Sequence, residues 1–188
     1  MCIRDSFTQV NGQTHVGTVL IDPATGQIDP SWTLQARTGT NGGRVSVKSI
    51  KIINDHIYLG GIFTHFQGNG ASWTYARNGA RLDINGKPDR SWNPEFNGTV
   101  IDIDVDENET YYYAAGYFTR AHNRVVENAG RLSTAAGAEL DQSWTFRHSY
   151  LIGKYQQTVT AANGRVYFGG SQHSLFGYNS DSMTRTSG

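Results

Sequence analysis

The sequence predicts an all-β fold made of repeated units of short antiparallel strands. Two phrases, one ending in Ser-Trp and one centred on a Gly-Gly or Ala-Gly pair, each occur three times in the 188 residues. The dipeptide Asn-Gly, which favours tight hairpin turns, occurs seven times. No window of a dozen residues shows a helical period, so we expect strands throughout.

The Ser-Trp phrase recurs at a spacing that suits one supersecondary unit. Its tryptophans, Trp32, Trp92 and Trp144, are 60 and 52 residues apart. A unit of this length cannot bury its apolar face alone, so we expect each indole to pack between neighbouring units. An Asp precedes each Ser-Trp pair by two residues, and we expect it to cap a turn.

The glycine phrase places small residues inside otherwise good strands. Its matched glycines, Gly61, Gly116 and Gly170, are 55 and 54 residues apart. Glycine weakens a strand, so its regular recurrence indicates a close backbone approach or a β-bulge.

The strands of the first two full units can be placed in order. In the first unit we expect strands over 45–52 and 56–61, joined by a turn at Asn54-Asp55. In the second unit we expect strands over 100–106, 111–119 and 128–133, with a polar turn at 107–110 and a surface loop at 120–127.

The third unit also contains a turn followed by a strand, as the first two units do. The second unit shows the clearest alternation of apolar and acidic residues. The turn Asn163-Gly164 precedes a strand over 166–170. In the second unit, alternation places Ile101, Ile103 and Val105 on one face of a strand and three Asp on the other, solvated face.

These units favour a β-propeller over the alternative, a β-solenoid. Units of about 40 to 55 residues with about four strands each are typical of propeller blades, and solenoid rungs are usually shorter. We predict a fragment of about three four-stranded blades, incomplete at both ends. The repeat units are expected at roughly 16–43, 44–99, 100–153 and 154–188.

The first six residues look foreign to the rest. Met1-Cys2-Ile3-Arg4-Asp5-Ser6 matches a translated transposon-end adapter of sequencing libraries, so we predict a non-native scar at 1–6 and a partial propeller domain over 7–188. The only cysteine, Cys2, belongs to this scar. The rest of the sequence therefore has neither disulfides nor thiolate metal sites.

Charge and hydropathy exclude some classes of partner. Sixteen basic residues balance sixteen acidic ones, so net charge does not steer the chain to nucleic acid. No stretch approaches the roughly 20 apolar residues that span a bilayer.

Several phrases, in the same order, resemble the delta-60 repeat family. They are 80–94, with its Asp89-x-Ser91-Trp92, then Asn97-Gly98-Thr99, then 115–119. The resemblance covers about 16–170. It implies β-propeller repeats in large secreted or surface-attached proteins, mostly bacterial, with no catalytic residues assigned. The family usually has Phe at the position of Trp92 and Gly at that of Ala115.

One partial motif raises a calcium hypothesis. Asp102, Asp104, Asp106 and Asn108 alternate as the first ligands of a calcium loop do. The sixth position holds Glu107 instead of Gly, and the twelfth holds Tyr113 instead of Glu. A solvated face of a strand explains the pattern without a metal, so we predict no cofactor and keep calcium as the alternative.

A binding surface is the remaining candidate site. The segment 66–78 is longer than its counterpart and contains Trp73 and Tyr75, which are suited to stacking on a sugar or a protein partner. Packing over a neighbouring blade is the alternative explanation. We find no catalytic set, since Ser91 lacks a Gly-x-Ser-x-Gly context.

Two functional hypotheses follow. The first is a non-catalytic propeller segment of a larger secreted or cell-surface protein, which acts as a scaffold for binding an unknown protein or carbohydrate. The second is part of a propeller enzyme, of the quinone-dependent dehydrogenase or lyase type, whose site lies largely in other blades.

Overall fold

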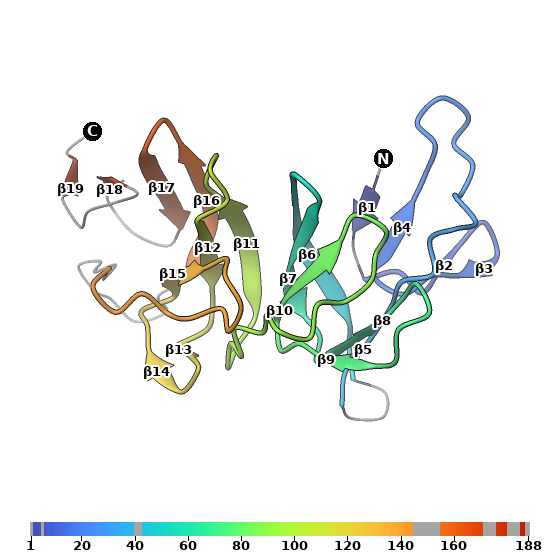
Figure 1. Cartoon of the computed structure of the whole chain (residues 1–188), viewed down its shortest axis with the longest axis horizontal. Coiled ribbons are helices and arrows are strands. Elements are labelled where there is room, and N and C mark those ends of the chain that lie inside the picture. Colours follow the sequence, from blue (N-terminus) through green and yellow to red (C-terminus); the bar gives the residue numbers. More distant parts are fainter. Residues whose placement is uncertain are drawn as a thin grey trace.

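A computed structural model describes residues 2–4, 6–39, 43–144, 155–170, 176–179 and 185–186. All regular elements in these residues are β-strands, arranged in several small antiparallel sheets (Figure 1). The all-β prediction is confirmed. The described residues include no helix that could cross a membrane.

Three main sheets follow one another along the chain. In spatial order their strands are β6 (Ser46–Ile53), β7 (His56–Ile62) and β10 (Gly79–Asp83); then β11 (Val100–Val105), β12 (Tyr111–Gly116) and β15 (Ala129–Ser133); then β16 (Gln156–Ala162), β17 (Arg165–Gly170), β18 (Phe176–Asn179) and β19 (Arg185–Thr186). Each begins with a hairpin at a turn that the sequence predicts.

The described residues also form four smaller sheets of two or three strands each. They are β1 (Cys2–Arg4) with β4 (Thr18–Leu20); β2 (Gln9–Val10) with β3 (Gln13–Thr14); β5 (Gln35–Arg37), β8 (His65–Gln67) and β9 (Thr74–Tyr75); and β13 (Arg120–Ala121) with β14 (Arg124–Val125). Strand β1 lies within residues 1–6, for which the sequence predicts a non-native scar. No sheet of the described residues closes on itself.

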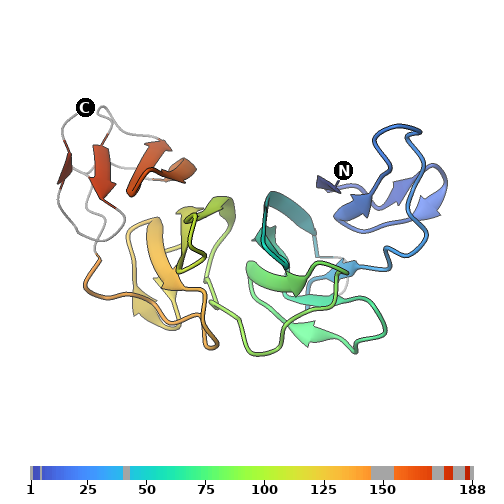
Figure 2. The same cartoon turned by 45° about the horizontal axis from the view of Figure 1, so that its top comes forward.

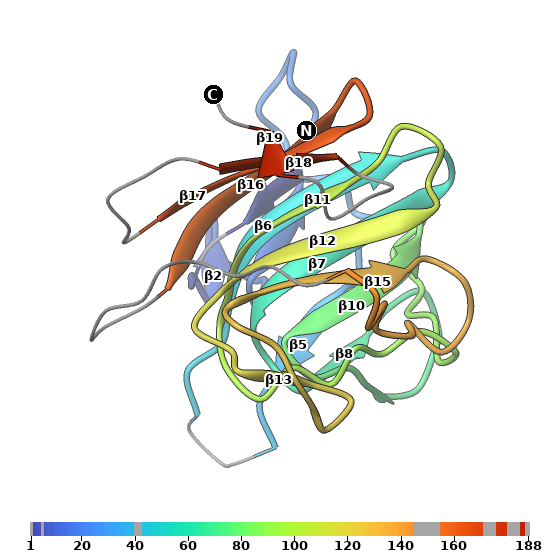
Figure 3. The same cartoon turned by 90° about the vertical axis from the view of Figure 1, so that its left-hand side faces the viewer.

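The first strands of the main sheets pack against one another. Strand β6 contacts β11, and β11 contacts β16, although no backbone ladder joins these sheets. The sheets are arranged along an arc (Figure 2), and a view from the side shows β6, β11 and β16 in succession (Figure 3).

The apolar core is divided among the seams between consecutive sheets. One buried cluster joins Trp32 to the β6 sheet, a second joins Tyr58 and Trp92 to the β11 sheet, and a third joins Tyr113 and Trp144 to the β16 sheet. A sheet of this size has too little apolar surface to form a core alone, so each unit depends on its neighbour.

All three repeated tryptophans are buried at these seams, as predicted. Trp92 is 0% exposed. Its ring lies 5.4 Å from that of Tyr58 on one sheet and 4.9 Å from that of Tyr112 on the next. Its indole N–H donates to the Ser133 carbonyl at 3.0 Å, so burial leaves no donor unsatisfied.

The repeated glycines coincide with matched β-bulges. The register of the first hairpin in each main sheet shifts opposite Gly61, Gly116 and Gly170. A Cβ at these positions would collide with the backbone carbonyls of Ser46, Thr99 and Tyr155. Both reasons that the sequence suggests for glycine, close approach and a bulge, therefore apply.

The Asp-x-Ser-Trp element forms the Asp-capped turn that the sequence predicts, and the first two main sheets have three strands each instead of the four predicted for a blade. Oδ1 of Asp89 accepts hydrogen bonds from the backbone N–H and the hydroxyl of Ser91, at 2.8 and 2.7 Å. Asp29 and Asp141 hold Ser31 and Ser143 in the same way. In the position of a fourth strand, this unit has an isolated bridge between Leu82 and Pro88. The backbone N–H of Ser91 is bound by the Asp89 side chain, so it cannot extend this bridge into a ladder.

Three further expectations about elements are wrong. The segment 120–127 is not a plain surface loop, since it contains the β13-β14 hairpin, and the candidate segment 66–78 likewise supplies β9 and part of β8. The strand expected over 111–119 ends at Gly116. Ile101 does not share the buried face of Ile103, because it is the extra residue of the bulge between Val100 and Asp102.

Candidate functional site

The clearest candidate binding surface is the solvent face of the β5-β8-β9 sheet. The register aligns Arg37 with His65 and His65 with Tyr75, and it aligns Gln35 with Gln67. Side chains two residues apart along a strand share a face. One face therefore presents the following residues: Gln35, Arg37, His65, Gln67, Trp73 and Tyr75.

The opposite face of this sheet is buried and fixes it to the molecule. Ala36, Phe66 and Ala76 are each at most 4% exposed. The ring of Phe66 packs on that of Phe63 at 4.6 Å. The solvent face is therefore displayed on a packed support.

Trp73 and Tyr75 lie on this solvent face and belong to no buried core cluster of the described residues. The Trp73 ring lies under the guanidinium of Arg37, whose Cζ is 4.2 Å from the ring centroid. Tyr75 is 44% exposed and meets the His65 ring edge-on at 5.4 Å. These two ring contacts thus lie within one small sheet and not across a seam between main sheets.

His65 is held between a hydroxyl and a cation. Its Nδ1 lies 2.8 Å from Oγ1 of Thr64. Partial burial, and then the charge of Arg37, lower the pKa of His65 from its usual value. Arg37 is therefore the permanent positive charge of this surface.

The sequence predicted Trp73 and Tyr75 but missed their polar neighbours. Gln35 and Arg37 precede these aromatics by more than 30 residues and join them only through pairing of β5 with β8. The alternation of Gln, Ala and Arg in β5 is a weak signal for a half-buried strand. It says nothing about which strand lies beside it.

The carboxylate oxygens of the calcium candidates already accept hydrogen bonds from other groups of the chain. Oδ1 of Asp102 accepts from the Ser49 hydroxyl at 2.7 Å, and Oδ2 accepts from the Thr158 hydroxyl and the Val159 N–H at 2.9 and 3.0 Å. This carboxylate therefore links β6 and β16 through β11.

The next aspartate along the strand repeats the link. Asp104 pairs with Lys51 Nζ at 2.6 Å and accepts from the Ala161 N–H at 2.8 Å. It is 7% exposed, so the expectation of a solvated Asp face is wrong. The reason is that β11 packs between β6 and β16, so its Asp side chains meet neighbouring sheets instead of solvent.

The other two members of the partial motif lie in the β11-β12 turn. Oδ1 of Asp106 accepts from the N–H groups of Thr110 and Tyr111 at 2.7 and 2.6 Å, and Asn108 belongs to the same turn. Within the described ranges, no group of three or more acidic, His or Cys side chains could hold a metal ion.

Calcium is expected to have no effect on stability. Because N–H and O–H donors already occupy Asp102 and Asp104, millimolar Ca²⁺ should leave the thermal midpoint of the chain unchanged, as should a chelator. Differential scanning fluorimetry with magnesium as the ionic-strength control measures this. A calcium-specific rise of several degrees, lost in Asp102→Asn, would restore the calcium hypothesis.

A carboxylate that departs from the repeat clamps the first two main sheets together. Glu109 has φ of 53° at the turn position where the other units have asparagine, Asn54 and Asn163. Its side chain accepts from Asn54 Nδ2 at 2.8 Å and from the Tyr58 hydroxyl at 3.0 Å, and it lies 2.6 Å from Nδ1 of His56. These contacts offset the backbone strain, which costs about 1 kcal/mol or more for such a residue.

Two repeated ion pairs stabilise the Asp-x-Ser turns. Nε and Nη2 of Arg81 both donate to Oδ2 of Asp89, at 2.9 and 2.6 Å. Arg131 binds Asp141 in the same way, at 3.0 and 2.5 Å. The sequence predicted the turn but not the arginine, which lies on the adjacent strand.

These contacts predict acid destabilisation. Burial alone would raise the pKa of Asp89, Asp141 and Glu109, but their hydrogen bonds and ion pairs outweigh it and lower each pKa. A lowered folded-state pKa contributes stability that is present above the unfolded value of about 4 and is lost as pH falls through the folded value. The urea midpoint should therefore hold from pH 7 to about 5 and fall below about 4.

The matched control for this prediction is Asp89→Asn. It should lower the midpoint at pH 7 and flatten the acid dependence, because one of the coupled carboxylates is gone. A midpoint that is constant from pH 5 to pH 3 in the unchanged chain would contradict the prediction.

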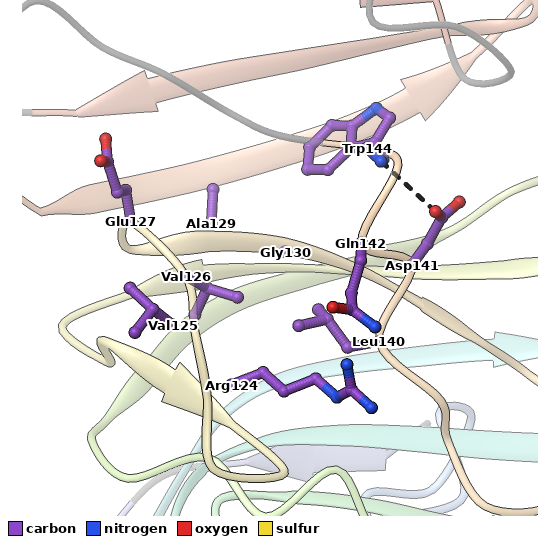
Figure 4. A pocket seen from close by; sticks show the side chains of 10 residues that line it. All are labelled: Arg124, Val125, Val126, Glu127, Ala129, Gly130, Leu140, Asp141, Gln142 and Trp144. Carbon is purple, nitrogen blue, oxygen red and sulfur yellow. Dashed lines mark hydrogen bonds between the residues drawn. The ribbon is translucent and has the colours of Figure 1, made fainter.

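A cavity of about 280 Å³ lies beside β14 and β15 (Figure 4). Val126, Ala129, Leu140 and Trp144 contribute apolar surface, and Arg124 and Glu127 contribute charge. Asp141, which also lines it, is already bound to Arg131 and Ser143. The Asp141 carboxylate in this cavity is therefore already engaged in its turn.

A second and more open cavity of about 690 Å³ includes His56, Lys87 and Arg90. Its carboxylates, Asp83 and Asp89, accept hydrogen bonds from neighbouring backbone or side-chain groups. These two carboxylates therefore help to hold the turn.

Comparison of the sequence with protein-family profiles and with curated proteins finds no significant match to either.

Proposed function

We propose that this chain is a non-catalytic repeat segment of a β-propeller, of the delta-60 type, in a larger secreted or cell-surface protein. Its role is to bind a carbohydrate or protein at the cell surface. Three features support propeller blades: successive sheets along an arc, inner strands β6, β11 and β16 in contact, and the same bulge in each sheet. Bound partners and further blades are part of this proposal.

A scaffold role is supported by the use of the repeated polar groups. The carboxylates of Asp89, Asp102, Asp104 and Asp141 all accept hydrogen bonds from within the chain. Carboxylates that accept these hydrogen bonds hold turns and seams, and their engaged oxygens make them poor general acids or bases.

The binding role is carried by one observation: the β5-β8-β9 sheet departs from the repeat. Its counterpart in the next unit, the hairpin of β13 and β14, has two strands and displays Arg124 and Val125. The three-stranded version adds Trp73, Tyr75 and Arg37 on a solvent face. Function on a repeat scaffold is expected where units differ.

The test is capture of native cell-envelope material on the immobilised chain. The double variant Trp73→Ala/Tyr75→Ala should lose most of the bound material. Tyr167→Ala is the matched control, since Tyr167 is 47% exposed on β17, away from this sheet, and it should retain capture. Equal capture by all three proteins, or turnover of a sugar or alcohol by the chain, would overturn the proposal.

A further inference from the structure

We infer that the solvent face of the β5-β8-β9 sheet binds a uronic acid residue of an acidic polysaccharide. In this arrangement Arg37 binds the sugar carboxylate and Tyr75 contacts the sugar ring. The inference rests on the proposed function and specifies its ligand.

The charge of the face is one-sided. Its six side chains include the cation Arg37 and the titratable His65, and none is Asp or Glu. Arg37 forms no ion pair with any carboxylate among the described residues, whereas the repeat arginines Arg81 and Arg131 are each paired with aspartate. An exposed guanidinium without an acidic neighbour is complementary to an anion from outside the chain.

The orientation of Arg37 suits a carboxylate. Arg37 Cζ lies over the Trp73 ring, 4.2 Å from its centroid, and a guanidinium held over a ring can still form two parallel hydrogen bonds to a carboxylate through its N–H groups. The stacking reduces the side-chain entropy that such a contact costs. Trp73 thus positions the guanidinium and does not itself need a free ring face.

The neighbouring side chains suit a sugar. Tyr75 presents an exposed ring that can contact the apolar face of a pyranose, and its position is fixed by His65 at 5.4 Å. Gln35 and Gln67, aligned on adjacent strands, carry amides that can donate to and accept from hydroxyl groups. A chain with zero net charge and a single permanent cation on this face is poorly suited to nucleic acid.

The experiment measures binding of the full chain to polygalacturonate, with dextran as the neutral control polymer, by affinity electrophoresis and calorimetry. Arg37→Gln should weaken polygalacturonate binding by about 10- to 100-fold, as expected for loss of a charged hydrogen-bonded contact. Arg37→Lys should recover part of this loss, because it keeps the charge and loses the paired geometry. Tyr75→Ala should weaken binding without changing its dependence on salt.

The matched control is Arg165→Gln, which removes an exposed arginine from β17 and should bind as the unchanged chain does. Circular dichroism checks that each variant is folded. Equal binding of dextran and polygalacturonate, no binding of either, or equal behaviour of Arg37→Gln and Arg165→Gln would overturn the inference. If the polygalacturonate test fails but capture of envelope material still requires Trp73 and Tyr75, the proposed binding function stands with a different ligand. If capture does not require these residues either, the inference and the proposed function both fail.

Discussion

Replacing Trp92 with alanine is expected to cause the largest loss of stability of any single change. The side chain is fully buried and its ring touches both neighbouring main sheets, at Tyr58 and Tyr112. Truncation leaves a cavity at the seam and removes the hydrogen bond to the Ser133 carbonyl. We expect a cost of about 3–5 kcal/mol in the free energy of unfolding, measured by urea denaturation.

Trp73→Ala is the matched control for this prediction. It removes the same side chain from a partly exposed position on the solvent face of a small sheet, where the ring contacts Arg37, so we expect a loss of under about 1 kcal/mol. Similar costs for the two variants would show that the seams between sheets do not carry the stability of the chain.

Replacing Asp102 with alanine should cost about 2–4 kcal/mol, because a carboxylate that accepts from two neighbouring sheets is lost and buried donors are left unpaired. The Val159 N–H on β16 and the Ser49 hydroxyl on β6 would lose their acceptor together. Asp102→Asn should also destabilise, since an amide NH₂ would face a donor on one of the two sides.

Asp55→Ala controls for the removal of a carboxylate as such. Asp55 is exposed in the turn between β6 and β7, and its loss should change the urea midpoint little. If Asp102→Ala and Asp55→Ala behave alike, the links across β11 contribute nothing to stability. Loss of cooperativity in Asp102→Ala, with a separate transition for β16, would show that the links couple the sheets.

Local patterns were enough to predict much of this fold. The hairpin turns, the buried tryptophans, the Asp-capped turns and the bulge glycines each depend on residues a few positions apart, and all were expected. The error at Ile101 has a local cause as well, since a bulge inserts one residue and shifts the face of those before it.

The candidate site was only half predictable. The aromatic residues Trp73 and Tyr75 stand out because they interrupt a repeat. Arg37 does not, because nothing in its own segment shows that β5 pairs with β8 from the following unit. Pairing between distant strands depends on the shape of the assembled molecule.

The sequence by itself determined the repeat, the all-β class and the residues that make each unit dependent on its neighbour. Only the tertiary structure decided what the polar side chains do. Asp102 and Asp104 alternate as solvated or metal-binding residues would, yet they bridge three sheets, because β11 lies between β6 and β16. The period of a strand specifies which side chains share a face, and only packing specifies what that face meets.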